Sequence, residues 1–518
     1  MKFKQYKNFI IFLLPFIFKY IFIYSFSELS YIEDGEIKED LLFCLLMGVL
    51  FCSNVFKRHF FNTLICFIYI LYFVLETSSY MAVSSNFSSS YMYLLIESNK
   101  GELSEFGASY ISTTIIFFII LMIALFFIIR KVKFKINLPK KILVTTFVSI
   151  GVLVILKLTG LIENNAYHNI VRGTYGYFKL QNSVKFNANL LKQDIKITAN
   201  NEVLVVVLGE STTSEHMQIY GYERETTPLL SSIKDSLYIY NDVISSDVIT
   251  TKSVPKILTS IDNTSKRTTS TNIIDLFNKA GYETYWLSNQ RPIGFYDNQI
   301  STIASVSSHL KFFNHQGEVK TTSYDGVIFP DFKTVLKREG KKVVFLRLIG
   351  THFDYDNRYP SRFKMFLSSD NLIKKDKILN NYDNAVLYND FVVYSFIKEL
   401  QKYTNKSALL YLSDHGENVY DNNTDFFGRS ETVLTKSMFE IPFFIWTSSD
   451  FEFPKDFDYK PDRVFMADHT YESIGHLFGV MYKDMDASRS IFSDSFIERR
   501  RKVIDNIDYE THFLDKDE

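Results

Sequence analysis

Hydrophobic positions divide the chain into an apolar first third and a mixed remainder. Five apolar stretches approach the length of about 20 residues that a helix needs to cross a bilayer. The second and third are short; the five cover residues 8–27, 41–56, 60–76, 112–130 and 142–160. The pattern predicts a transmembrane domain of five helices over residues 1–160, whereas a soluble bundle of buried helices is the weaker alternative.

Basic residues in the short loops predict the orientation of these helices. They precede the first stretch and lie between the second and third and between the fourth and fifth, at residues 2–7, 57–58 and 130–141. The alternate loops are acidic around residues 28–40 and Ser-rich around 77–110. With five helices, the N-terminus is cytoplasmic and the chain after about residue 160 lies outside the cytoplasm. No small-residue cleavage pattern follows the first stretch, so we interpret it as a retained anchor.

Residues 161–200 mix aromatic and polar side chains, among them Tyr167, Tyr175, Tyr177 and Phe178. Such a mixture predicts linker helices that lie on the membrane surface. A plain linker accounts for the composition equally well.

From about residue 201 the pattern changes to short apolar runs that alternate with amphipathic stretches. Helices are predicted between the runs, for example at 271–280 and 383–402, and strands at 203–208, 283–287, 342–348, 408–412 and 441–446. Continuous apolar strands that alternate with helices favour an α/β domain over residues 201–518, with a largely parallel sheet covered on both faces. In such sheets, ligands bind beyond the carboxyl ends of the strands.

Composition adds two limits. The chain has 518 residues and a formal net charge of -1, so the overall charge gives no indication of a nucleic-acid partner. Its 3 cysteines, Cys44, Cys52 and Cys66, all lie in the apolar part, so the chain after residue 66 cannot form a disulfide within itself. Cysteine usage therefore neither supports nor excludes an oxidising compartment.

Metal-capable side chains follow three of the predicted strands. Glu210 follows 203–208, His352 follows 342–348, and Asp414 and His415 follow 408–412. Zinc accepts nitrogen and oxygen ligands of these types. Each residue alone could be an ordinary loop residue, but together they predict a metal site at one edge of the sheet.

Thr250 and Thr251 precede a predicted helix that contains Pro255. One interpretation is a helix N-cap, which is a common role for threonine. The other is a nucleophile, because coordination to a metal makes a hydroxyl reactive at neutral pH. The spacing alone favours the cap.

Several motifs occur in the order found in one family. They are GESTTSEHMQIYGYERETTP at 209–228, Thr250 with Ser253 and Pro255, SDHGE at 413–417 and IPFFIWTS at 441–448. Together they resemble the membrane-bound phosphoethanolamine transferases of Gram-negative bacteria, members of the alkaline phosphatase/sulfatase superfamily. The resemblance covers nearly the whole chain, including the five predicted helices.

The resemblance implies roles for individual residues. Thr250 aligns with the family's nucleophile, and the implied zinc ligands are Glu210, Thr250, Asp414 and His415. Substrate-binding roles, for donor phosphate, a second zinc or the phosphoethanolamine group, are implied for His352 and Asn289. His216 matches a recurring histidine of the first motif, for which a structural role is the alternative.

The chain departs from the family at Arg429, which stands where a second-site histidine is expected. Arginine cannot ligate zinc but binds phosphate through two parallel hydrogen bonds. We therefore expect a guanidinium contact in place of the second metal or phosphate subsite.

The function that the resemblance implies is zinc-dependent transfer of phosphoethanolamine from phosphatidylethanolamine to an envelope acceptor through a covalent threonine intermediate. The acceptor is lipid A, lipooligosaccharide core or another glycan, and loops 291–325 and 353–380 are expected to choose it. The implied location is the bacterial inner membrane, with the catalytic domain in the periplasm. The alternatives are a glycerophosphate transferase of the same superfamily, which the first motif disfavours, and an inactive envelope-binding scaffold.

Overall fold

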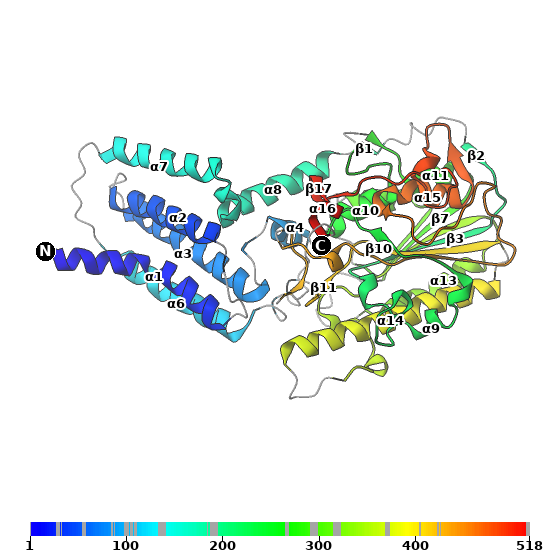
Figure 1. Ribbon diagram of the computed structural model, residues 1–518, viewed down its shortest axis with the longest axis horizontal. Helices are drawn as coiled ribbons and strands as arrows, with labels where there is room; N and C mark the ends of the chain where they lie inside the picture. The colour runs from blue at the N-terminus through cyan, green and yellow to red at the C-terminus, as the bar shows by residue number, and fades with distance from the viewer. Residues whose placement is uncertain are drawn as a thin grey trace. The chain divides into compact units, whose positions relative to one another are not determined.

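The computed structural model describes residues 2–513 except 27–31, 33, 54–58, 84–85, 88, 98–102, 104–106, 108–110, 133–140, 184, 187–194, 265–268, 291–298, 314–322, 368–372, 404–405, 422–423, 425 and 432. The chain forms two compact units, one of residues 1–98 and 102–178 and one of residues 99–101 and 179–518 (Figure 1). The boundary near residue 178 lies inside the predicted linker, and the division into 1–160, 161–200 and 201–518 remains a prediction.

The first unit is helical. Its main helices coincide with the five predicted apolar stretches and are α1 (Lys2–Phe26), α2 (Asp34–Ser53), α3 (His59–Val83), α6 (Thr113–Ile129) and α7 (Lys141–Leu158). Among the described residues, only Lys7–Phe26 and Phe60–Ala82 are long and apolar enough to cross a membrane by themselves, while Thr113–Ile129 and Ile142–Leu158 are apolar but shorter. The count of five transmembrane helices therefore remains a prediction.

Part of the predicted acidic loop is helical instead. Residues 34–40 begin α2, and Lys19 of α1 is buried against it, 2.8 Å from Glu36 and 2.7 Å from Asp40. Pairing of this kind offsets the cost of burying the lysine charge. The sequence pattern missed it because the partners lie on different helices. Residues 28 and 33 lie outside the described part of the chain.

Three shorter helices are also described in this unit: α4 (Ser90–Glu97), the 3-10 helix η1 (Leu161–Asn164) and α8 (Ala166–Ser183), of which the residues from Lys179 belong to the second unit. Helix α8 exposes Val171, Tyr175 and Phe178. Exposed apolar side chains are typical of helices that lie on a membrane. They support the predicted interfacial role, which remains a prediction.

The second unit is built on a seven-stranded sheet in the order β4-β13-β10-β3-β9-β7-β8. Its strands are β3 (Val203–Gly209), β4 (Leu237–Tyr240), β7 (Glu283–Ser288), β8 (His309–Phe312), β9 (Lys342–Arg347), β10 (Ser407–Ser413) and β13 (Phe443–Thr447). All neighbouring strands pair in parallel except that β13 is antiparallel to both β10 and β4. The predicted largely parallel sheet is confirmed. The sequence could not predict whether β13 runs parallel or antiparallel to its neighbours. A run that is apolar on both faces indicates that the strand is buried but not which way it runs.

Helices cover both faces of this sheet (Figure 1). On one face lie α10 (Thr250–Leu258), α11 (Ile273–Lys279) and α15 (Thr470–Leu477), and on the other α9 (Pro228–Ser231), α13 (Phe329–Leu336) and α14 (Lys374–Tyr403). The predicted helices at 271–280 and 383–402 correspond to α11 and α14. The unit also contains α12 (Gln299–Ser305) and α16 (Tyr509–Phe513).

Among the residues that the structure describes, short strands of this unit form five two-stranded sheets. They are β1 (Lys185–Phe186) with β6 (Thr269–Ser270), β2 (Ile195–Ile197) with β15 (Val480–Tyr482), β5 (Val243–Ile244) with β14 (Phe465–Met466), β11 (Asn418–Val419) with β12 (Phe427–Gly428), and β16 (Lys502–Val503) with β17 (Ile507–Asp508).

The register of the central strands aligns their carboxyl ends. Gly209 of β3 lies opposite Ser413 of β10, and Leu208 lies opposite Arg347 of β9. The residues that follow these three strands therefore emerge at the same edge of the sheet.

Candidate metal centre

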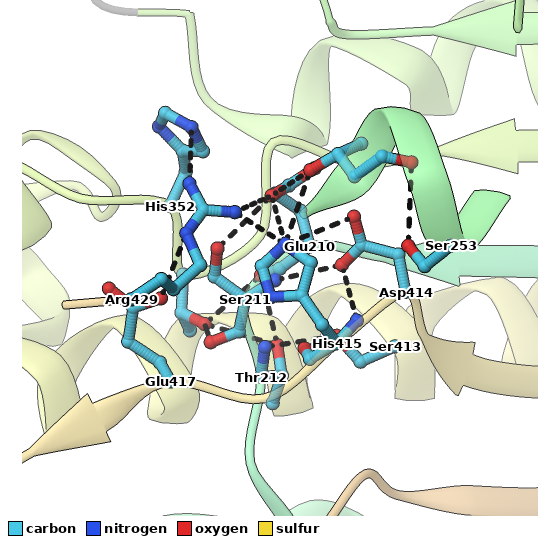
Figure 2. Close-up of polar contacts among 12 residues, drawn as sticks. Glu210, Ser211, Thr212, Ser253, His352, Ser413, Asp414, His415, Glu417 and Arg429 are labelled. Atoms are coloured by element: carbon cyan, nitrogen blue, oxygen red, sulfur yellow. Dashed lines mark hydrogen bonds and ion pairs between the residues drawn. The ribbon is translucent and has the colours of Figure 1, made fainter. Parts of the chain in front are cut away.

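Three side chains with metal-binding atoms meet at this edge (Figure 2). Glu210 directly follows β3, and Asp414 and His415 directly follow β10. One oxygen or nitrogen from each residue lies within 4.8 Å of those of the other two, and all three side chains are buried. The strand register thus brings together three of the four ligands expected from the sequence.

The chemistry of this group fits zinc. Nδ1 of His415 hydrogen-bonds to the carbonyl of Gly416 at 2.7 Å, so Nε2 faces the carboxylates, 3.4 Å from both Glu210 Oε1 and Asp414 Oδ2. Asp414 Oδ2 is buried without a hydrogen bond, although buried carboxylate oxygens normally have one. Zinc binds two carboxylates and an imidazole whose other nitrogen is held by a carbonyl.

The backbone around the group is constrained. Ser211 has a φ of 59°, which side chains rarely adopt, and its N–H donates to Asp414 Oδ1 at 3.1 Å. At Gly416 an added Cβ would lie 1.9 Å from the carbonyl oxygen of Ser437, so only glycine fits. Such strain and close approach are characteristic of functional sites.

The Thr250 hydroxyl joins this group. It donates to Glu210 Oε1 at 3.1 Å and lies 3.2 Å from Nε2 of His415. Thr250 is the first residue of α10, and Ile249 occupies the N-cap position without a side-chain hydrogen bond. The prediction that a threonine caps the N-terminus of α10 is therefore wrong, because the Thr250 hydroxyl bonds to the Glu210 carboxylate instead. Thr250 is only half-buried, so it borders the more exposed side of the centre.

Arg429 lies directly beside the centre. Its Nη1 contacts Nε2 of His415 and lies 3.4 Å from Glu210 Oε1, while Nη2 lies 3.5 Å from Nε2 of His352. Desolvation and the charges of Arg429 and Arg358 hold the pKa of His352 well below its usual value, against the opposing charge of Glu210. His352 is therefore neutral at pH 7. The guanidinium of Arg429 places a permanent positive charge next to both histidines.

The surroundings shift the pKa values of the two carboxyl groups in opposite directions. Burial by itself would raise the pKa of Glu210, but the hydrogen bond and charge of His415, with the charge of Arg429, hold it well below its usual value. Burial and the neighbouring Glu210 raise the pKa of Asp414 to about 6. At pH 7 both carboxylates are charged, as ligands of a cation must be.

Asn289 and His216 lie in other networks. Asn289 is buried, and its amide donates to Ser323 O at 3.0 Å and to Asp325 Oδ1 at 2.9 Å. His216 lies between Asp383 Oδ1 at 2.8 Å and Asp421 Oδ1 at 3.0 Å. The structure does not bring these two predicted site residues to the metal centre.

Gln290 and Glu417 also contact residues of the site, and the sequence analysis did not single them out. Gln290 donates from Nε2 to Glu210 Oε2 at 3.3 Å and to the carbonyl of Leu348 at 2.9 Å. Glu417 accepts from the Tyr355 hydroxyl at 2.9 Å, and its other oxygen lies 3.6 Å from Nε of Arg429. Gln290 closely follows a predicted strand, and Glu417 ends the SDHGE motif. Both positions could therefore have been predicted to lie near the site.

His216 is expected to make stability depend on pH. Burial would lower its pKa, but hydrogen bonds and charges from Asp383 and Asp421 raise it to about 9. A raised histidine pKa stabilises the fold fully below the unfolded value of about 6.5, and this stabilisation is lost as pH rises through about 9. His216→Gln should therefore lower the free energy of unfolding by about 3 kcal/mol at pH 6, and by less above pH 9.

Thermal unfolding followed by tryptophan fluorescence tests this, because Trp286 and Trp446 are both in the central sheet. The matched control is His309→Gln, which removes a half-exposed histidine paired with Glu283 on the surface and should cost under about 1 kcal/mol. The same pH slope in the His216 variant and in the unmodified chain would contradict the expectation.

Comparisons with known proteins identify the class. The Sulfatase family matches residues 202–477. The chain is 30% identical to phosphoethanolamine transferase CptA of Salmonella typhimurium over 480 residues, which cover 82% of this chain and 81% of CptA. It is 27% identical to phosphoethanolamine transferase EptC of Escherichia coli K12 over 467 residues, with coverage of 82% and 81%.

Two solved structures are similar. The C-terminal periplasmic domain of Escherichia coli EptC in complex with Zn aligns at a TM-score of 0.59 and 32% identity, over 62% of this chain and 96% of that domain. The integral membrane phosphoethanolamine transferase EptA of Neisseria meningitidis aligns at a TM-score of 0.69 and 19% identity, over 94% of this chain and 97% of EptA, which is a likeness of fold.

Fold and site thus define an enzyme with a sulfatase-like α/β domain and an N-terminal helical region. The chain belongs to the phosphoethanolamine transferase family, as the order of its motifs indicated.

Proposed function

We propose that the chain transfers phosphoethanolamine from phosphatidylethanolamine to an envelope acceptor, with Thr250 as nucleophile and zinc as cofactor. The observation that carries the proposal is the Thr250 hydroxyl, 3.1 Å from Glu210 and 3.2 Å from His415 at the start of α10. The names of the relatives support the transferred group, and the related domain solved with Zn supports the metal. Candidate acceptors are lipid A, lipooligosaccharide core and other glycans.

The proposed location is the bacterial inner membrane, with the catalytic unit in the periplasm. The basic loops of the first unit support this orientation. One similar structure is described as an integral membrane protein and another as a periplasmic domain. A membrane location keeps the enzyme next to a lipid donor.

The four proposed ligands are Glu210, Thr250, Asp414 and His415. Zinc, when bound, supplies a Lewis acid that favours the ionised form of the threonine hydroxyl. Glu210 orients that hydroxyl by accepting its hydrogen bond and is the nearest acceptor for its proton. Ser211 and His415 hold Asp414 in place through backbone N–H groups, 3.1 Å and 2.8 Å from Oδ1.

Two displacements follow from this geometry. Thr250 Oγ1 attacks the phosphorus of the donor, the bond to the glycerol oxygen breaks, and diacylglycerol leaves with a proton. An acceptor hydroxyl or phosphate then attacks the same phosphorus, and the threonine oxygen leaves and regains its proton. A phosphoryl group on Thr250 would lie at the first residue of α10, where a helix N-terminus favours an anion.

Arg429 occupies the proposed second subsite. Its guanidinium contacts His415 and lies near His352, within reach of a phosphoryl group held at Thr250. A cation that is always charged there balances the negative charge of the equatorial oxygens in both displacements. We propose that Arg429 replaces the second metal or phosphate subsite.

Mass spectrometry of the peptide that contains Thr250 tests the function. Purified protein is incubated with phosphatidylethanolamine and zinc but without acceptor. A phosphoethanolamine adduct on Thr250, absent from Glu210→Ala, is the expected result. An unmodified peptide from zinc-loaded protein would contradict the donor and direct the search to glycerophosphate lipids. Protein that holds no zinc would support the scaffold alternative.

A further inference from the structure

One surface segment of the catalytic unit displays large apolar side chains to solvent. Met365 and Leu367 are 67% and 73% exposed, and Ile373, which directly precedes α14, is 64% exposed. Isolated exposed apolar residues are ordinary in soluble proteins. A group of them in one segment is typical of an interaction surface.

The backbone of this segment is held in place. The buried Asn384 of α14 accepts hydrogen bonds from the N–H groups of Met365 and Phe366 at 2.8 Å and 2.9 Å, and donates to Phe366 O at 2.9 Å. Asn380 donates to the carbonyl of Leu367 at 3.2 Å. Phe366 lies partly buried beside Arg224, whereas its two neighbours point outward. The exposure of Met365 and Leu367 is therefore built into the fold.

Three basic side chains lie in the same stretch of chain. Arg362, Lys364 and Lys374 are all exposed. Lys374, the first residue of α14, lies about 9 Å along the helix from Asn380, which contacts Leu367, and Ile373 directly precedes it. Apolar side chains with a basic border match a membrane surface that carries anionic lipids, because the apolar part enters the acyl boundary while the cations meet the head groups.

We propose that this apolar patch, formed by Arg362, Lys364, Met365, Leu367, Ile373 and Lys374, docks the catalytic unit on an anionic lipid surface. The first unit contains helices able to cross a bilayer. The bilayer is therefore present at high effective concentration, and even weak docking is populated.

Docking at this patch has a consequence for the metal centre. Tyr382, on the same helix as Asn384, donates to Ser211 O at 2.8 Å and accepts from Thr213 N at 3.1 Å. Helix α14 thus contacts both the patch and the segment that follows Glu210. A lipid surface at the patch would therefore lie against the same helix that contacts the segment after Glu210, whatever reaction occurs at the centre.

Leu367→Trp in the full chain, reconstituted into vesicles, tests the proposal. The two native tryptophans, Trp286 and Trp446, are 1% and 4% exposed, so the introduced ring is the only exposed indole among described positions. In vesicles that contain phosphatidylglycerol, its emission should shift to the blue and lose intensity when the acyl chains are brominated. The matched control is Leu310→Trp on β8, an equally apolar position 45% exposed, which should not be quenched.

Charge reversal separates lipid docking from other contacts. Adding Lys364→Glu and Lys374→Glu to the Leu367→Trp chain should weaken docking by about fivefold for each cation removed. Vesicles of phosphatidylcholine alone should give the same loss. Transfer from a detergent-dispersed donor should not change, so failure of docking and failure of the proposed reaction are distinguishable.

Two results would overturn the proposal. One is a Leu367→Trp chain that is quenched no more than the Leu310→Trp chain in anionic vesicles. The other is a blue shift without quenching by brominated chains, which would show that protein, such as a second copy of the chain, covers the patch.

Discussion

Thr250→Val is expected to abolish phosphoethanolamine transfer, while Thr251→Val leaves it unchanged. The two threonines are neighbours in the first turn of α10, and valine preserves the branched shape of each. The Thr250 hydroxyl donates to Glu210, whereas the Thr251 hydroxyl is buried without a hydrogen bond. Losing the proposed nucleophile should lower the transfer rate by about 10⁴-fold or more. Removing an unpaired buried hydroxyl costs little.

The measurement is the initial rate of transfer from labelled phosphatidylethanolamine, with the adduct on the 250-containing peptide as a second readout. Thr250→Ser keeps the hydroxyl and should retain measurable transfer, which separates loss of chemistry from loss of shape. A Thr250→Val chain that works within tenfold of the unmodified chain would refute the assignment of this residue as nucleophile.

Asp414→Asn is expected to abolish the proposed zinc binding without loss of the fold. The asparagine oxygen can still accept from the N–H groups of Ser211 and His415, which now bond to Oδ1. Oδ2, the oxygen without a hydrogen bond, becomes an amide nitrogen that cannot ligate a metal. Removing a residue that only hydrogen-bonds to a metal ligand lowers metal affinity by up to roughly 100-fold, so replacing a ligand itself should lower zinc affinity by more.

Zinc titration of the full chain, with thermal unfolding of the zinc-free protein as the folding control, measures both effects. The unmodified chain should saturate at one tight equivalent if Arg429 occupies the second subsite, as proposed. Glu472→Gln is the matched control: burial raises the pKa of Glu472 to about 8, so glutamine resembles its protonated form. Tight zinc binding by the Asp414 variant would disprove the ligand assignment, and two tight equivalents would disprove the role of Arg429.

Most residues of the metal centre could be predicted from the sequence, because they directly follow apolar runs that form parallel strands. Apolar runs located β3, β9 and β10, and polar residues at their ends suggested Glu210, His352, Asp414 and His415. Parallel strands place their carboxyl ends at one edge, so local pattern and general topology were sufficient.

Side-chain direction was harder to predict. Asn289 and Gln290 are neighbours after β7, yet Gln290 contacts Glu210 and Asn289 turns to Asp325. His216 lies six residues after Glu210 but is held by Asp383 of α14 and by Asp421. These partners are distant in sequence, and the motif gives no information about which of two neighbouring polar residues faces the site.

The sequence alone determined the α/β class, the apolar first third, the family and the residue types of the centre, because these depend on periodicity and on motif order. Only the tertiary structure decided that Thr250 joins Glu210 and His415 instead of capping α10, and that Arg429 lies against the same imidazole. It also decided that β13 is antiparallel and that Lys19 pairs with α2. Each of these depends on contacts between segments far apart in the chain, where burial and charge pairing outweigh local preference.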